Sequence, residues 1–261
     1  MSTVGSSRRG LRRWLSVVTG NMARAAGYVE PDPAHMPHPD QRFGRLTYAQ
    51  HGDDLIVLAV FDAMGIDCPS YLDVGAHHPY NISNTALLYA RGSRGVNIEA
   101  NPNLYQAFLT SRPEDTNLNV GVSPCASAPM TFYMIDKWSG RNTFDKQVAE
   151  DFVLAHPQFS ITETMEVPVM TINDIVDRHC SGRFPDFLSI DVEGLDESII
   201  RSIDFERGAP KVICAEVVTG GGGARNEAGL KQYLAGQGYF SLIRCGGNTV
   251  FVRNEYREQV T

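Results

Sequence analysis

The feature that most constrains the fold of this chain is a repeated alternation of short apolar runs with helix-like segments, which starts near Arg42. Most runs are bounded by turn residues and are followed by apolar residues at helical spacing. This order is typical of βα units around a mostly parallel sheet. The expected strands are 70–76, 94–100, 116–123, 130–136, 187–192 and 211–218, and the expected helices are 53–65, 84–92, 104–111, 171–180, 197–203 and 226–238.

The strands expected at the end of the chain distinguish between two kinds of parallel-sheet fold. Residues 239–246 and 248–255 read as two strands joined across Gly246 and Gly247. A dinucleotide-binding sheet would usually continue as βα units, whereas a terminal hairpin places an antiparallel strand in an otherwise parallel sheet. We therefore expect an α/β, Rossmann-like fold with a mostly parallel sheet and a C-terminal antiparallel β-hairpin.

Three segments fall outside the βα pattern. Residues 1–41 combine the basic stretch SRRGLRRW with the proline-rich PDPAHMPHPDQ, so we expect an arm and a linker ahead of a folded domain at 42–261. The arm could form a basic amphipathic helix on a membrane or a partner, or pack as a frayed extension or a homodimer contact. Residues 137–168, polar and aromatic, are predicted to be an insertion that caps the substrate, and the glycines of 219–223 predict a lid.

Composition excludes several classes of protein. The formal net charge of −7 argues against general nucleic-acid binding and suits a small cationic or neutral ligand. The five cysteines are scattered without a CxxC pair, which disfavours a zinc site or a disulfide framework and favours a reducing compartment. No apolar run approaches the roughly 20 residues of a membrane-spanning helix. SRRGLRRW resembles a twin-arginine signal, but the segment after it is short and interrupted, so a cytoplasmic location is expected.

Acidic residues follow four of the expected strands. They are Asp73, Glu99, Asp191 with Glu193, and Glu216. The carboxyl ends of parallel strands line the ligand crevice of an open α/β sheet, so these acids should share one site. Each alone could simply cap a helix, but an acid at the tip of the second strand can also accept hydrogen bonds from both ribose hydroxyls. The pattern predicts a nucleoside-containing ligand.

The turn after the first strand narrows the choice of nucleoside. A pyrophosphate needs close backbone approach and hence GxGxxG, whereas this turn offers Gly75 alone, followed by Ala76, His77, His78 and Pro79. A dinucleotide is therefore disfavoured. S-adenosylmethionine has no phosphate and carries a positive sulfonium, which suits a single-glycine turn above an acid. The chain looks like a class I methyltransferase.

Four segments together resemble the FkbM family of S-adenosylmethionine-dependent O-methyltransferases. They are YAQHGDDLIVLAVF, YLDVGAHHPYNISNTALLYARGSRGVNIEANP, VPVMTINDIV and FLSIDVEGLDESIIRSIDF, and the resemblance covers about Leu46 to Phe251. It implies a seven-stranded methyltransferase fold and O-methylation, commonly of a sugar or polyketide-type hydroxyl. The chain departs from the family's SQxGED pattern at Ala49 and Asp53. The expected cofactor-binding residues are Gln50, Asp73, Gly75, Ala76, His77, Asn84, Thr85, Glu99, Ala100, Asn101 and Asp191.

The acceptor expected from this resemblance is a sugar hydroxyl of a bacterial oligo- or polysaccharide, with a mannoside as the narrower hypothesis. A polyketide or other small-molecule hydroxyl is the alternative acceptor. Two other classes stay open, a nucleotide-dependent oxidoreductase and a non-catalytic binding protein.

An acceptor hydroxyl must lose a proton, and the sequence offers two routes. In the first, Asp191, Glu193 and Glu216 bind Mg²⁺, which acidifies the hydroxyl. In the second, a side chain is the direct base, with His77, His78 and His51 as histidine candidates. The expected catalytic residues are Asp191, His78 and Glu193. The alternatives are a structural hydrogen bond for His78, an arginine partner for Glu193 and a helix-capping role for Glu216.

Overall fold

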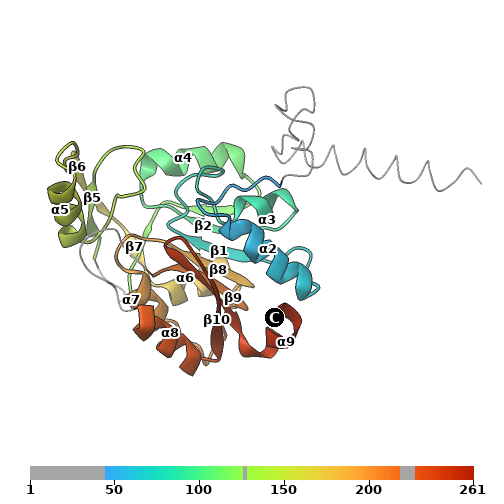
Figure 1. The fold of residues 1–261 in the computed structure, drawn as a ribbon. Coiled ribbons are helices and arrows are strands. Elements are labelled where there is room, and N and C mark those ends of the chain that lie inside the picture. The colour runs from blue at the N-terminus through green and yellow to red at the C-terminus, as the bar shows by residue number, and fades with distance from the viewer. Residues whose placement is uncertain (1–44, 126–127, 218–226) are drawn as a thin grey trace, which may run out of the picture.

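A seven-stranded sheet with the order β10-β11-β9-β8-β1-β2-β3 forms the centre of the computed structural model (Figure 1). The structure describes residues 45–125, 128–217 and 227–261, so the predicted arm and linker at 1–41 and the predicted lid at 219–223 lie outside the described residues. The strands of the sheet are β1 (Tyr71–Val74), β2 (Gly95–Ile98), β3 (Thr116–Leu118), β8 (Phe187–Ile190), β9 (Val212–Glu216), β10 (Tyr239–Cys245) and β11 (Asn248–Arg253).

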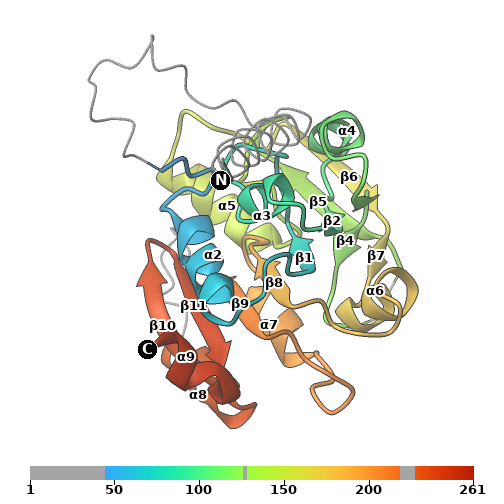
Figure 2. The ribbon, with the colours of Figure 1, turned by 90° about the vertical axis from the view of Figure 1, so that its right-hand side faces the viewer.

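The predicted mixture of parallel and antiparallel pairing is confirmed. β1 pairs in parallel with β2 and β8, β2 with β3, and β8 with β9. β11 is antiparallel to both β9 and β10, so the second strand of the hairpin lies inside the sheet and the first forms its edge (Figure 2). The burial of the two strands explains this order, since the four central residues of β11 are all buried while half-buried and exposed positions dominate β10.

Helices cover both faces of the sheet, as the alternating side chains of the strands require. In β1, Leu72 and Val74 pack in one core cluster with residues of α6, α7 and α8, while Tyr71 packs in a second cluster with residues of α2 and α3. The helices are α2 (Asp53–Ala63), α3 (Ala86–Ala90), α4 (Pro102–Ser111), α6 (Ile172–His179), α7 (Asp196–Arg201), α8 (Glu227–Gly236), a 3-10 turn (Asn254–Tyr256) and α9 (Arg257–Val260).

The expectation of one strand at 116–123 was wrong. The chain leaves the main sheet after β3, and β4 (Gly121–Val122) pairs instead with β7 (Val169–Met170) in a separate two-stranded sheet. Asn119 is the anchor for this change, because its side-chain amide donates to the backbone oxygens of Glu99 and Ala100. The segment after β3 is therefore held beside Glu99 and Ala100, at the end of β2.

Residues 137–168 contain more regular structure than their sequence indicates. α5 (Lys146–Ala155) begins at Asp145, whose carboxylate accepts from the backbone of Gln147 and Val148. β6 (Glu163–Val167) pairs antiparallel with β5 (Met130–Met134) in a second small sheet. Figure 1 shows α5, β5 and β6 together at one side of the main sheet. No helix in the described part of the chain is long and apolar enough to cross a membrane.

Candidate functional site

Two joined cavities lie where the sheet topology places a ligand, at the carboxyl ends of β1, β2 and β8. The larger, which we call the polar cavity, holds about 800 Å³ of space open at the surface. The smaller, the apolar cavity, holds about 500 Å³. The residues that line both cavities, and so join them, are Gly75, His77, Gly140, Asp191 and Glu193.

The two cavities differ in chemistry. Ile98, Leu104 and Phe132 give the apolar cavity a hydrophobic wall, and Glu99 lies at its edge. The polar cavity is lined instead by amide, hydroxyl and carboxyl groups, including those of Asp73. Of the expected cofactor-binding residues, those that line a cavity are Gln50, Asp73, Gly75, Ala76, His77, Asn84, Glu99, Ala100 and Asp191.

The turn after β1 lies in close contact with the ends of both neighbouring strands, β2 and β8. Gly75 has a φ of 78°, and a Cβ atom at this position would lie 1.9 Å from the backbone oxygen of Asp191. The backbone N–H groups of Gly75 and Ala76 both donate to the backbone oxygen of Ile98. The glycine is therefore required by the packing of β1 between β2 and β8.

Glu99 is a buried acid held by the same turn. Its Oε2 accepts from the backbone N–H of His77 at 2.8 Å, and its Oε1 accepts from that of Asn101 at 2.7 Å. Burial raises the pKa of Glu99 to about 7, against the lowering effect of these two donors. Each carboxylate oxygen has a second lone pair, so Glu99 can still accept from a ligand.

Thr85 and Asn101, both expected to contact a cofactor, lie behind the cavity walls. Neither side chain is exposed. The Thr85 hydroxyl donates to Asp73 at 2.6 Å, and Asn101 begins α4 by accepting from the backbone of Asn103. Asn101 also donates to the backbone oxygen of Lys137, which ties the predicted cap to the end of β2. Thr85 thus supports Asp73, which lines the polar cavity, while neither Thr85 nor Asn101 itself lines either cavity.

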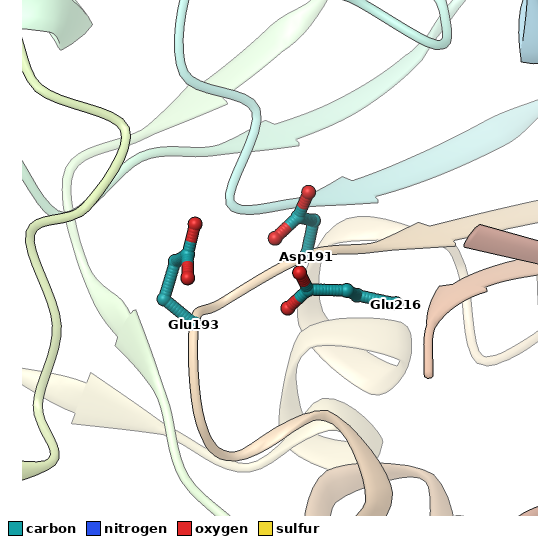
Figure 3. A group of neighbouring side chains, drawn as sticks. All are labelled: Asp191, Glu193 and Glu216. Atoms are coloured by element: carbon teal, nitrogen blue, oxygen red, sulfur yellow. The ribbon is translucent and has the colours of Figure 1, made fainter. Parts of the chain in front are cut away.

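Three carboxylates meet beside the junction of the two cavities (Figure 3). Asp191 and Glu193 follow β8 and Glu216 ends β9, and each offers an oxygen within 4.8 Å of the others. Burial and the neighbouring acids raise the pKa of Glu216 to about 9 and that of Asp191 well above its usual range. Sequence reasoning placed these residues together because β8 and β9 are adjacent and parallel.

An arginine from the predicted cap already binds one of these acids. Nη1 of Arg141 lies 2.8 Å from both carboxylate oxygens of Glu193, and the Thr143 hydroxyl donates to the Glu193 backbone oxygen. Glu193 adopts a left-handed φ of 50°. The alternative of an arginine partner for Glu193 is therefore observed, and this contact ties the predicted cap to the carboxylates.

Further residues of the cap segment line the cavities. Ser139 and Asn142 face the apolar cavity with Phe144. The side chain of Asn142 accepts from the backbone of Ile135 and donates to that of Asp136, which shapes this loop. The neighbouring Trp138 is 64% exposed.

The three candidate histidines are in different environments. His77 lines both cavities, and its Nδ1 is buried with no hydrogen-bond partner among the described residues. Burial and the neighbouring His78 lower the pKa of His77. His78 lines neither cavity, and its Nδ1 accepts from the backbone of Tyr80 and Asn81, which is the structural alternative. His51 packs against the turn at Gly246.

A buried polar network below Asp73 is absent from the sequence predictions. Arg112 is fully buried and contacts Asp115, Thr85 and Tyr71. In the sequence it is an arginine just after a helix, which is a common surface position. No local pattern distinguishes it, because its partners come from segments distant in the chain.

The mainly parallel sheet with its antiparallel hairpin, and the acids at the ends of its strands, fit a Rossmann-like methyltransferase. The model of the methyltransferase FkbM domain matches residues 73–240, which is more than half of the chain. The chain belongs to the FkbM methyltransferase family, as the sequence resemblance implied. No match was found among curated proteins or among solved structures.

Proposed function

We propose that this protein is an S-adenosylmethionine-dependent O-methyltransferase with a class I fold and a saccharide acceptor. The observation that carries the proposal is the pair of joined cavities, one apolar with a carboxylate at its edge and one lined by acids. S-adenosylmethionine has the matching pair of ends, a flat purine on a ribose and a cationic sulfonium with an amino-acid tail.

The apolar cavity suits the adenosine part of this cofactor. Its hydrophobic wall offers contact to a purine, and the free lone pairs of Glu99 are available to the ribose hydroxyls. The acids of the polar cavity, among them Asp73 and Asp191, would attract the sulfonium and the ammonium group.

The hydrogen bonding of the turn argues against a nicotinamide dinucleotide. A pyrophosphate is bound by free backbone N–H groups at the first βα turn. Here the N–H groups of Gly75 and Ala76 are used by Ile98, and that of His77 is used by Glu99. At this turn, the oxidoreductase alternative therefore lacks the free backbone N–H groups of a phosphate site.

Asp191 is the proposed reacting acid, because it lines both cavities and its pKa is raised by burial and by neighbouring acids. A carboxylate of raised pKa is a stronger base toward an acceptor hydroxyl. Methyl transfer is an in-line displacement, so holding the hydroxyl in line with the sulfonium methyl supplies much of the acceleration.

The alternative route uses Mg²⁺, which would acidify the acceptor hydroxyl when bound. Oxygen donors from Asp191, Glu193 and Glu216 suit this hard cation. Glu216 has a buried oxygen without a partner among the described residues, whereas Glu193 is engaged by Arg141. Treatment with EDTA separates the routes: activity lost and then restored by Mg²⁺ selects the metal, and full activity selects Asp191 as direct base.

The saccharide acceptor is supported by the cap segment. Sugars present hydroxyls to amides and charged groups and an apolar face to aromatic rings. Arg141 of the cap lines the polar cavity, and Trp138 of the same segment is exposed. A screen of sugar acceptors with methyl-labelled cofactor, read by the carbon that gains the label, tests the acceptor class. Labelling of only non-sugar hydroxyls would refute this part of the proposal.

Calorimetry tests the cofactor directly. We expect binding of S-adenosylmethionine and S-adenosylhomocysteine and none of NAD. Asp73→Ala and Glu99→Ala should each weaken binding without unfolding the protein. Asp67→Ala is the matched control, because this exposed residue precedes β1 at the opposite end of the strand. A wild-type protein that binds neither adenosyl ligand would overturn the proposed function.

A further inference from the structure

The strongest unexplained feature of the molecule is the charged side chain buried below the polar cavity. Arg112 and Thr85 both have no exposed surface. Arg112 donates through Nε to Asp115 at 2.9 Å, through Nη2 to the Tyr71 hydroxyl at 2.7 Å, and through both Nη1 and Nη2 to the Thr85 hydroxyl at 3.0 Å. Burial of a guanidinium is costly unless it is paired and hydrogen-bonded, and here all three nitrogens of Arg112 donate.

These contacts determine the direction of the next hydrogen bond. A guanidinium has donors only, so Thr85 must accept both N–H groups with its two lone pairs. The hydroxyl proton is then left for Oδ2 of Asp73, which lies 2.6 Å away. Arg112 therefore orients the Thr85 hydroxyl as a donor, and Asp73 must be the acceptor.

We propose that Thr85 and Arg112 are positioning residues of the cofactor site, which together hold Asp73 in place as a hydrogen-bond acceptor in the wall of the polar cavity. This inference rests on the proposed function, because it assigns Asp73 to a cationic part of the cofactor. Neither residue lines a cavity, so both act only through Asp73.

The electrostatics of the site explain why such support is needed. Burial raises the pKa of Asp73, and the Thr85 hydrogen bond, the charge of Arg112 and a hydrogen bond from Ser189 oppose this. Four further titratable groups that interact electrostatically with Asp73 are acids or thiols, namely Asp115, Glu99, Asp191 and Cys214, and His77 and Arg141 line the same cavity. Arg112 is a cation that interacts with Asp73, and the two residues are linked by the Thr85 hydroxyl, which hydrogen-bonds to both.

The test compares three substitutions at Thr85 with a control elsewhere. Thr85→Val keeps the shape but removes the hydroxyl, Thr85→Ala removes it while leaving room for water, and Thr85→Ser retains it. Tyr239→Phe is the control, because it removes a buried hydroxyl that donates to the backbone of Pro210 on the far side of the sheet. Affinity for S-adenosylmethionine is measured by calorimetry between pH 5 and 9, together with the melting temperature of each variant.

We expect Thr85→Val and Thr85→Ala to weaken binding about tenfold near pH 7, a change of roughly 1.4 kcal/mol. Their loss of affinity at acidic pH should begin at a higher pH than in the wild type. Thr85→Ser should stay within about twofold of the wild type, which is a difference below about 0.5 kcal/mol. Tyr239→Phe should lower the melting temperature and leave the affinity and its pH dependence unchanged.

Two results would overturn the inference. One is wild-type affinity and pH dependence in whichever of Thr85→Val and Thr85→Ala folds. The other is a loss of cofactor affinity in Tyr239→Phe equal to that in the Thr85 variants, which would show that the loss comes from general destabilisation. Both outcomes require that the wild type binds the cofactor, so they are distinct from failure of the proposed function, in which the wild type does not bind.

Discussion

Replacement of Glu99 by glutamine should make the protein less sensitive to alkaline pH while weakening its cofactor site. The folded-state pKa of Glu99 is raised from 4.5 to about 7, mainly by burial. The native state therefore holds this proton more tightly than the unfolded chain. The stability that this protonated Glu99 contributes is fully present below about pH 4.5 and is lost as the pH rises through about 7. The loss amounts to about 3 kcal/mol, at roughly 1.4 kcal/mol per pKa unit.

Glutamine at position 99 removes the ionisable group and also disturbs the hydrogen bonds that the carboxylate accepts. It has no charge to bury, but its amide nitrogen must face one of the two backbone donors, His77 or Asn101, and leave that donor unpaired. An unpaired buried donor costs about 1–3 kcal/mol at every pH. We therefore expect Glu99→Gln to be less stable than the wild type at pH 5 and equally or more stable at pH 8.

Urea unfolding of the cofactor-free protein at pH 5 and pH 8 measures the effect. The difference in unfolding free energy between wild type and Glu99→Gln should change by about 3 kcal/mol between the two pH values. The exposed Glu258→Gln serves as the control for effects unrelated to burial. The same variant should bind S-adenosylmethionine about tenfold more weakly, a loss of roughly 1.4 kcal/mol. A stability difference that is the same at both pH values would refute the reasoning.

Four further substitutions test the reacting centre. Asp191→Asn should lower kcat by about 10²–10⁴ and also weaken cofactor binding in calorimetry, because this acid lines the polar cavity; an unchanged kcat would remove Asp191 as base. His77→Ala should reduce methyl transfer, because His77 lines the polar cavity. His78→Ala should keep the activity and cost about 1 kcal/mol of unfolding free energy, because His78 only accepts from the backbone. The reverse pattern in a labelled-methyl assay would restore His78 as base. Arg141→Gln removes the guanidinium from both oxygens of Glu193, so Mn²⁺ affinity measured by spin resonance should rise about tenfold, or roughly 1.4 kcal/mol; equal affinity would contradict competition by the guanidinium.

Much of the fold could be predicted because it depends on local patterns. The strands of the main sheet are short apolar runs between turn residues, and the amphipathic α6 begins at Thr171 as its sequence indicates. β6 and α5 were missed because their burial is low and their partners are distant in the chain. β6 in particular has two half-buried or buried positions out of five, which gives no clear strand period.

The candidate site could be predicted to a similar degree and for a similar reason. Asp73, Glu99 and Asp191 follow strands whose carboxyl ends must meet, so the sequence places them at one crevice. The roles of their neighbours were less accessible. Thr85 matches a family motif, yet its hydroxyl serves Asp73 and does not line a cavity.

The class of fold, the acids at the strand ends and the resemblance to a methyltransferase family can all be read along the chain, because strand periodicity and turn chemistry are local properties. Which polar groups pair with one another is visible only in the folded protein. The bonds of Arg141 to Glu193 and of Arg112 to Thr85 join segments 52 and 27 residues apart. Such contacts depend on how distant segments pack around the sheet, and no spacing along the chain encodes them.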